Sequence, residues 1–430
     1  MFDKFGFLPG DILIPKNRDK NWAVVACDQY TSEPEYWNRV DKFVGESPSS
    51  LRVILPEIYL EEENVSERIN NVLKTAGEYL NGGIFDEYKN SLIYVERTIS
   101  NGKVRKGIVG LIDLECYDFS KGSSSLVRAT EGTIAERIPP RLKIREKIAL
   151  ELPHIMLLID DPQKCVIEPR ASQKLNKIYD FDLMENGGHI KGWQITGDDL
   201  KSVEKSLGSL FDAVEYYEKY GMTTETPLIF AVGDGNHSLA SAKTHYENLK
   251  AAQPDDAQLV RYALVEMVNI YDESLEFEPI HRMLFDVDPE DVIDEFLRWC
   301  KASCLNGRTS ATSQKIEFIH KENTGFITVD TENERFDFNE MESTLAVGIL
   351  QNFIDGYINT HGGRVDYVHG DEVVRNLSQK EKNIGFLLPS PQKNTLFKAV
   401  ITDGALPRKT FSMGNANDKR FYLEARKIKV

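Results

Sequence analysis

The sequence predicts an α+β fold, also described as mixed α/β, in which strands and helices are interspersed and some strands pair antiparallel. Three observations lead to this class. An apolar run at 228–232 ends in small and polar residues that continue into a helical pattern. Two further apolar runs flank Asn101-Gly102, a pair that favours a tight hairpin turn. The length of 430 residues exceeds what one hydrophobic core usually needs, so we expect more than one domain.

The predicted elements follow one another closely, without a repeat or an obvious flexible linker. In chain order they are strands at 12–15 and 22–26, a helix at 67–81 ending at Gly82-Gly83, a hairpin from 91–100 and 107–113, a strand at 154–160, a helix at 198–220, a strand at 228–232, a helix at 238–249, a strand or helix at 257–269, antiparallel strands at 316–320 and 325–329, and a helix near 343–359. We place domain boundaries near residues 150 and 285, giving regions 1–150, 151–285 and 286–430. One interwoven unit would satisfy the same pattern.

Composition excludes several classes of partner. No run approaches the roughly 18 apolar residues of a membrane span, and residues 1–7 do not resemble a signal peptide, so we expect a cytoplasmic protein without a membrane partner. The formal net charge of −16 disfavours nucleic-acid binding, which needs basic surface. Five cysteines are too sparse for a disulfide framework. A small-molecule substrate and a homo-oligomer are both compatible with this composition.

The stretch 233–238, Gly-Asp-Gly-Asn-His-Ser, lies between the predicted strand at 228–232 and the helix after it. Backbone N–H groups at a helix N-terminus favour an anion, to which Asn236 and Ser238 add polar side chains. Asp234 could hold a cation and His237 could move a proton. The alternative is an ordinary turn, in which Asp or Asn caps the helix and a glycine permits the bend.

A second cluster of charge lies in the segment 126–141. Arg128, Arg137 and Arg141 could bind phosphate or carboxylate in a bidentate fashion, beside the hydroxyl of Thr130 and the carboxylate of Glu131. The alternative is a solvated helix start, with Thr133 and Glu136 as a capping box.

Other strand ends carry further candidates. Asp28 and Tyr30 follow the predicted strand at 22–26, and strand ends are favoured places for ligands. Cys27 has an acid and no base beside it, so we interpret it as a packed thiol. His281 and Arg282 could bind an anion, with a structural role as the alternative.

Four motifs together resemble one family, the bacterial and archaeal proteins that share domain of unknown function 1015. They are Arg-Ala-Thr-Glu-Gly-Thr at 128–133, Gly-Asp-Gly-Asn-His-Ser at 233–238, Pro-Ile-His-Arg at 279–282 and the ending Leu-Pro-Arg-Lys-Thr-Phe-Ser-Met-Gly at 406–414. The resemblance covers nearly the whole chain. It implies membership of a sequence class and does not imply a reaction.

The Asp-Gly-x-His segment also resembles that of the ParB/sulfiredoxin superfamily, which includes nucleotide-dependent kinases of free serine. The resemblance implies a core of that type with large elaborations, a metal assisted by Asp234, a phosphoryl contact from His237 and a catalytic base, for which Glu131 is the best candidate. Ser238 replaces the arginine usual in those kinases. A phosphate clamp is therefore expected from Arg128, Arg141 or Arg282.

These observations lead to a functional hypothesis: metal-assisted phosphoryl transfer or phosphate-ester processing on a small amino acid such as serine or phosphoserine. A serine kinase and a phosphoserine phosphatase both fit, with Mg²⁺ as the metal and ADP or ATP as the co-substrate. The alternative is a non-catalytic nucleotide-binding regulator. A P-loop ATPase and a Rossmann oxidoreductase are disfavoured because their glycine-rich motifs are absent from the sequence. The predicted catalytic residues are Glu131, Asp234 and His237, with Asp234 also at the metal, and the predicted binding residues are Asp28, Tyr30, Arg128, Thr130, Arg141, Asn236, Ser238, His281 and Arg282.

Overall fold

The computed structural model describes residues 2–132, 138–221, 224, 226–302, 314–329, 345–402, 404–407 and 409–429. The α+β class is confirmed, with helices interspersed among mixed sheets. The chain forms two compact units, one of Met1–Glu276 with Gly414–Val430 and one of Phe277–Met413. Residue 150 lies inside the first unit and residue 285 inside the second, so the units divide the chain at other positions than those placed from sequence.

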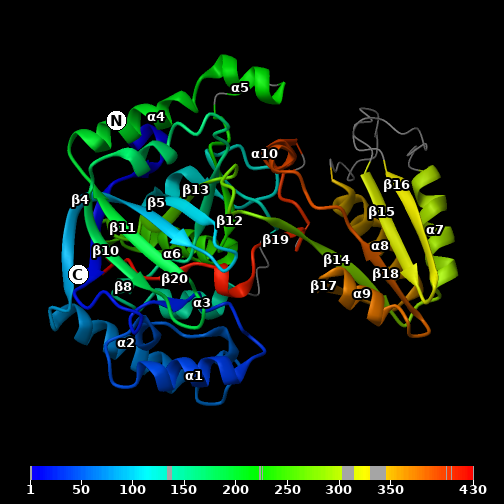
Figure 1. The fold of residues 1–430 in the computed structure, drawn as a ribbon, viewed down its shortest axis with the longest axis horizontal. Coiled ribbons are helices and arrows are strands. Elements are labelled where there is room, and N and C mark those ends of the chain that lie inside the picture. Colours follow the sequence, from blue (N-terminus) through cyan, green and yellow to red (C-terminus); the bar gives the residue numbers. More distant parts are fainter. Residues whose placement is uncertain are drawn as a thin grey trace. The chain divides into compact units, whose positions relative to one another are not determined.

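Within the described residues of the first unit, 11 strands form one mixed sheet (Figure 1). Its path runs β10 (Asn176–Asp182), β11 (His189–Ile195), β4 (Phe85–Thr98), β5 (Val104–Asp113), β13 (Tyr262–Asn269), β9 (Met156–Ile159), β12 (Phe230–Asp234), β7 (Val127–Ala129) and β6 (Tyr117–Asp118), while β1 (Phe7–Leu8) pairs with β5 and β2 (Gly10–Pro15) with β4. Strands β9, β12 and β13 are almost entirely apolar and buried, which is why they occupy the middle of the path.

Helices of the first unit lie on two opposite sides of this sheet. In Figure 1, α1 and α2 lie below it and α4 and α5 lie above it. The helices are α1 (Pro34–Val44), α2 (Val65–Asn81), α3 (Ile138–Arg145), α4 (Asp198–Ser209), α5 (Ala213–Tyr220) and α6 (Asn236–Ala252). Among the described residues, no helix is long and apolar enough to cross a membrane.

Local patterns predicted several elements correctly. Strands β4 and β5 form the antiparallel hairpin expected across Asn101-Gly102, where Gly102 adopts a φ of +81°. Helix α2 ends at the expected Gly82. The single helix predicted at 198–220 is wrong, because α4 ends at Ser209 and the side chain of Asp212 accepts hydrogen bonds from Val214 N and Glu215 N to start α5.

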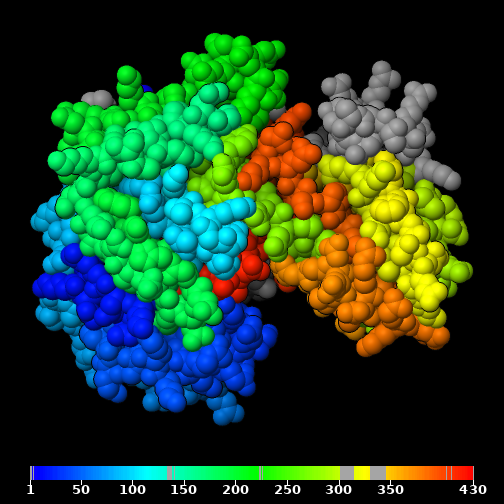
Figure 2. Space-filling view, in the orientation of Figure 1, coloured from blue at the N-terminus to red at the C-terminus, as the bar shows by residue number. Residues whose placement is uncertain are grey.

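The C-terminal segment returns to the first unit after the second unit is complete. Strand β20 (Phe421–Tyr422) pairs with β3 (Val24–Val25), and β21 (Arg426–Lys427) pairs with β8 (Leu150–Glu151). Figure 2 shows this red segment as a small area among the blue and green parts of the unit. The last residues of the chain therefore help to hold two segments from its first half.

The second unit contains a smaller antiparallel sheet with helices packed on it. Among its described residues the strand order is β16 (Asn323–Val329), β15 (Gln314–His320), β18 (Asn383–Leu387), β14 (Phe277–Phe285) and β17 (Arg364–His369), and β19 (Phe411–Met413) pairs with β14. Its helices are α7 (Pro289–Ala302), α8 (Ala346–His361), α9 (Asp371–Leu377) and α10 (Lys393–Thr402). The antiparallel pair predicted from 316–320 and 325–329 is confirmed as β15 and β16.

Candidate functional site

The junction between β12 and α6 has the geometry expected from the motif Gly-Asp-Gly-Asn-His-Ser. Gly235 occupies the N-cap position with φ +78° and ψ 26°, and no side chain among the described residues caps the helix there. A Cβ atom at Gly235 would lie 3.0 Å from Cα of Ile155, so this position requires glycine for space as well as for conformation. The uncapped N-terminus of a 17-residue helix presents backbone N–H groups and the positive end of its dipole.

Asp234 is the last residue of β12 and lies directly before this helix. Its Oδ1 accepts a hydrogen bond from Gly235 N at 3.0 Å, and its Oδ2 lies 3.2 Å from Nζ of Lys419. The described residues contain no group of three or more His, Cys, Asp or Glu side chains that could hold a metal ion. Asp234, the predicted metal ligand, instead forms an ion pair with Lys419.

The two motifs of the sequence meet through Thr130 and Asn236. Thr130 Oγ1 donates to Val232 O at 2.6 Å, and Asn236 Nδ2 donates to the same carbonyl at 3.2 Å and to Thr130 Oγ1 at 3.4 Å. Both side chains are buried, and they join the end of β7 to the end of β12. Glu131 follows Thr130 in the chain, and the side chains of Glu131 and His237 are both partly buried.

His154, which the sequence did not single out, lies at the centre of the site. Its Nε2 is 3.0 Å from Oγ of Ser238 and 3.8 Å from Oδ2 of Asp28, and its Nδ1 is 2.7 Å from the hydroxyl of Tyr422. The hydroxyl oxygen of Tyr422 also accepts the backbone N–H of Cys27 at 3.2 Å. Three distant segments therefore converge on one imidazole.

Both ring nitrogens of His154 have a hydroxyl neighbour. Burial raises the pKa of Tyr422 well above its usual value, so the phenol keeps its proton. Tyr422 contacts Nδ1 and Ser238 contacts Nε2, and the tautomer of the imidazole decides which atom donates in each contact.

The acidic and thiol groups beside His154 have opposite characters. Burial works against ionisation of Asp28, but the positive charge of His154, a hydrogen bond from Gln29 and the charges of Lys419 and Arg141 outweigh it and lower its pKa. Asp28 is therefore a carboxylate. Burial, with the charge of Asp28, raises the pKa of the Cys27 thiol to about 12, so Cys27 is not a ready nucleophile.

A pocket of about 160 Å³ opens beside these residues. Its polar side chains are Glu57, Arg141, Arg145, Glu151, His154, Ser238, Ser241 and Tyr422, and Arg141 forms an ion pair with Glu57. The remaining wall is largely aliphatic and includes Val53, Leu55, Leu60, Ile144, Ile148 and Ile155. A pocket with an apolar wall and few polar groups is the usual form of a small-molecule site.

Other predicted residues in the first unit have structural partners. Arg128 donates through Nε to Ser125 O at 2.9 Å and through a terminal nitrogen to Thr226 O at 3.3 Å. Tyr30 has a φ of +52° and stacks on Tyr36 with ring centroids 3.7 Å apart. Arg137 lies outside the described residues.

His281 and Arg282 belong to β14 in the second unit, and both are buried. His281 accepts Leu388 N–H at Nδ1 and lies 3.0 Å from Asp371 through Nε2. Burial lowers its pKa, although Asp371 opposes this shift. Arg282 donates from Nε to Oε1 of Gln351 at 3.0 Å, and to the main-chain oxygens of Ile280 and Lys409. These contacts correspond to the structural alternative for both residues.

Strand direction explains why sequence reasoning missed His154. The predicted binding residues follow the ends of strands, whereas His154 precedes β9. Strand β9 runs antiparallel to β12, with Met156 opposite Asp234, so the beginning of one strand lies beside the end of the other. Lys419 and Tyr422 gave no signal, because they reach the site only through the return of the C-terminal segment.

A family model described as "Protein of unknown function (DUF1015)" matches residues 10–357. The chain belongs to this family. The match confirms the family resemblance predicted from the four motifs, and the DUF1015 description assigns no activity. No curated protein matches the sequence.

Solved structures that resemble this DUF1015 chain do so weakly. A conserved hypothetical protein from Pyrococcus furiosus is 11% identical, with a TM-score of 0.34 over 74% of this chain and 94% of that chain. A free serine kinase in complex with AMP is 10% identical, with a TM-score of 0.36 over 73% and 90%. SbnI from Staphylococcus aureus, truncated at its C-terminus, is 10% identical, with a TM-score of 0.34 over 73% and 82%. Likenesses of this size transfer neither residues nor reactions.

Proposed function

We propose that the first unit is an enzyme of phosphoryl transfer or phosphate-ester processing that acts on a small amino acid such as serine or phosphoserine. One observation carries the proposal: Ser238, in the first turn of α6, lines a pocket together with His154, and the carboxylate of Asp28 lies 3.8 Å from the same imidazole. Phosphoryl transfer requires mainly positioning and positive charge around the phosphate oxygens.

The start of α6 suits the phosphate group. Backbone N–H groups and the helix dipole attract an anion, and the Ser238 hydroxyl, 3.0 Å from Nε2 of His154, adds a polar group there. His237 lies in the same first turn and contacts the phosphoryl group in this proposal. In this proposal the nucleotide phosphates hold most of the coordination of a Mg²⁺ ion, which neutralises their charge. Asp234 contributes the protein ligand.

In this proposal the amino acid substrate binds beside the carboxylate of Asp28. Asp28 remains ionised and suits the substrate ammonium group. In the kinase direction the serine oxygen forms a bond to the terminal phosphorus of ADP or ATP, while the bond from that phosphorus to the bridging oxygen breaks. Glu131 takes the hydroxyl proton, and the electron pair of the broken bond leaves with the shortened nucleotide. The aliphatic pocket suits the nucleotide base.

The test is direct. The purified chain is incubated with Mg²⁺ and serine plus ADP or ATP, and separately with phosphoserine, and phosphoserine and inorganic phosphate are followed by ³¹P NMR. We expect turnover in one of these reactions and its loss in Asp234→Asn. Lys205→Met, on the exposed side of α4, is the matched control and keeps wild-type turnover. Absence of turnover in every reaction would refute the proposal.

A nucleotide-binding regulator is the second candidate, and one observation favours it. Lys419 already neutralises Asp234, so the site can attract an anion without a catalytic metal. Tight binding of nucleotide in calorimetry, without any product, would select this function.

A further inference from the structure

The proposed phosphate site needs a cation near the start of α6, where Ser238 is uncharged. In the first unit Arg128 is bound to two carbonyl oxygens and Arg141 is paired with Glu57. Lys419 differs from both, because its Nζ lies 3.2 Å from Oδ2 of Asp234 at the start of α6. An ammonium group has three donors, so this one contact leaves capacity for a ligand.

The charge of Lys419 acts on both carboxylates of the site. It is paired with Asp234, and it is one of the charges that keep Asp28 ionised. Its side chain is 13% exposed, so its field is less screened than that of a surface lysine. Lys419 thus lies where an incoming phosphate would meet the helix N-terminus.

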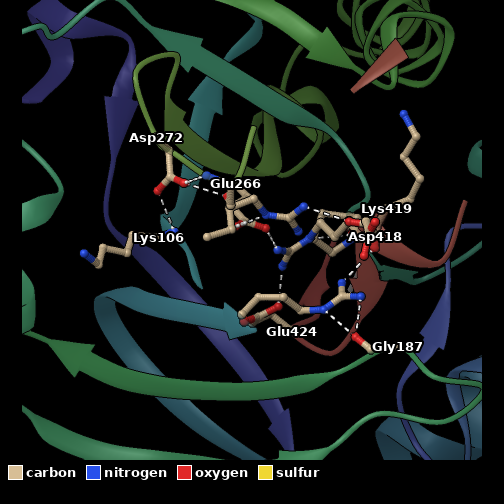
Figure 3. A network of polar contacts seen from close by, with 12 residues as sticks. Lys106, Gly187, Glu266, Asp272, Asp418, Lys419 and Glu424 are labelled. Carbon is tan, nitrogen blue, oxygen red and sulfur yellow. Dashed lines mark hydrogen bonds and ion pairs between the residues drawn. The ribbon is translucent and has the colours of Figure 1, made fainter. Parts of the chain in front are cut away.

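A buried ionic network holds the main chain on both sides of Lys419 (Figure 3). Arg97 donates to Lys419 O at 2.8 Å and to Asn417 O at 2.7 Å. Arg105 donates to Asp418 O at 2.8 Å, and Ser100 donates to the Asp418 carboxylate from N and Oγ, each at 2.9 Å. The Lys419 side chain extends away from this network (Figure 3), and its Nζ lies 3.2 Å from Oδ2 of Asp234, so its main chain is anchored while its ammonium group reaches the site.

The same network also fixes the residues around His154. Arg420 donates from Nε to Pro153 O at 3.1 Å and pairs with Glu266 and Glu424, and Ala26 N donates to Arg420 O at 2.9 Å. Buried ion pairs seldom add net stability compared with apolar packing. We therefore interpret these buried ion pairs as contacts that hold the segment around Lys419 in position.

We propose that Lys419 is the cation that binds the phosphate of the substrate, and that Arg97 is a positioning residue that places it. The proposal rests on the proposed function, because it names the phosphate-binding group of the same site. Arg97 touches no ligand and acts through the carbonyl oxygens of Asn417 and Lys419.

The experiment measures binding of inorganic phosphate to the full chain by calorimetry, together with KM and kcat for the reaction found. Lys419→Met is expected to weaken phosphate binding about 10- to 100-fold, the value of a hydrogen bond to a charged group. Lys205→Met is the control and leaves the affinity unchanged. Wild-type affinity in Lys419→Met overturns the proposal.

The role of Arg97 is tested by coupling. Arg97→Lys is expected to raise KM for the phosphate-bearing substrate, and to add nothing to the loss of affinity once Lys419 is Met. A further loss in the double variant would show that Arg97 acts elsewhere and would refute its positioning role. If Arg97→Lys does not fold, Ser100→Ala replaces it in the same cycle, because it removes one hydrogen bond to Asp418.

The two proposals fail in different ways. A wild-type chain that neither binds phosphate nor turns over any substrate refutes the proposed function. A wild-type chain that binds phosphate as tightly as Lys419→Met refutes the role of Lys419 alone.

Discussion

Gly235→Ala tests the geometry of the junction on which the candidate site depends. The left-handed conformation at φ +78° costs an alanine about 1–2 kcal/mol. Its Cβ would lie 3.0 Å from Cα of Ile155, and such overpacking costs about 1–3 kcal/mol. The smaller entropy of the unfolded chain returns about 0.4–1 kcal/mol. We therefore expect a net loss of about 1–5 kcal/mol in the free energy of unfolding.

Urea unfolding followed by tryptophan fluorescence measures this loss, since Trp22, Trp37 and Trp193 all belong to the first unit. Gly221→Ala is the matched control, because Gly221 has a similar conformation, with φ +74° and ψ 16°, and no atom of the described part of the chain lies within 4 Å of its added Cβ. The difference between the two variants isolates the contact with Ile155. If Gly235→Ala were as stable as Gly221→Ala, the close packing inferred at the junction would be refuted.

Three further predictions concern buried ionisable side chains. Because the folded pKa of Asp28 is lowered, the unfolded chain binds more protons in acid, so the stabilisation from Asp28 is present above about pH 4 and is lost as the pH falls through the folded pKa. Asp28→Asn should therefore be less stable than the wild type at pH 7 in urea titrations, with a gap that narrows below about pH 4; a constant gap would contradict this reasoning. With a pKa of about 12, Cys27 should resist iodoacetamide at pH 8 in the folded protein and react after denaturation, as followed by peptide mass spectrometry; rapid labelling of the folded protein would be inconsistent with its burial. Arg420→Met should cost about 3–5 kcal/mol in urea unfolding, because it removes the ion pairs of Arg420 with buried Glu266 and Glu424 and leaves Glu266 only its longer contact with Arg105, and adding Glu266→Gln should recover part of the loss.

Elements that depend on nearby residues could be predicted from the sequence. The β4–β5 hairpin follows from Asn101-Gly102, and the end of α2 from Gly82, because turn and cap preferences act within a few residues. The prediction of a single helix at 198–220 is wrong because it does not take the N-cap residue Asp212 into account, although that signal is local. The junction of β12 with α6 was placed correctly, since an apolar strand, glycines and a helical pattern are adjacent there.

Residues whose roles depend on distant partners could not be assigned in this way. Arg128 lies in a polar motif typical of anion binding, yet its guanidinium is directed to the carbonyl oxygens of Ser125 and Thr226. His154 precedes an apolar run and gave no signal, because its partners Ser238 and Tyr422 come from other parts of the chain.

By itself, the sequence determined the α+β class, the family and the glycine-rich junction at Asp234, because these depend on local patterns and on motif order. Only the tertiary structure decided which side chains surround that junction. The antiparallel pairing of β9 with β12 brings His154 to it, and the return of the C-terminal segment brings Lys419. Strand pairing and the burial of Arg97 and Arg420 involve residues far apart in the chain, so no local pattern contains their positions.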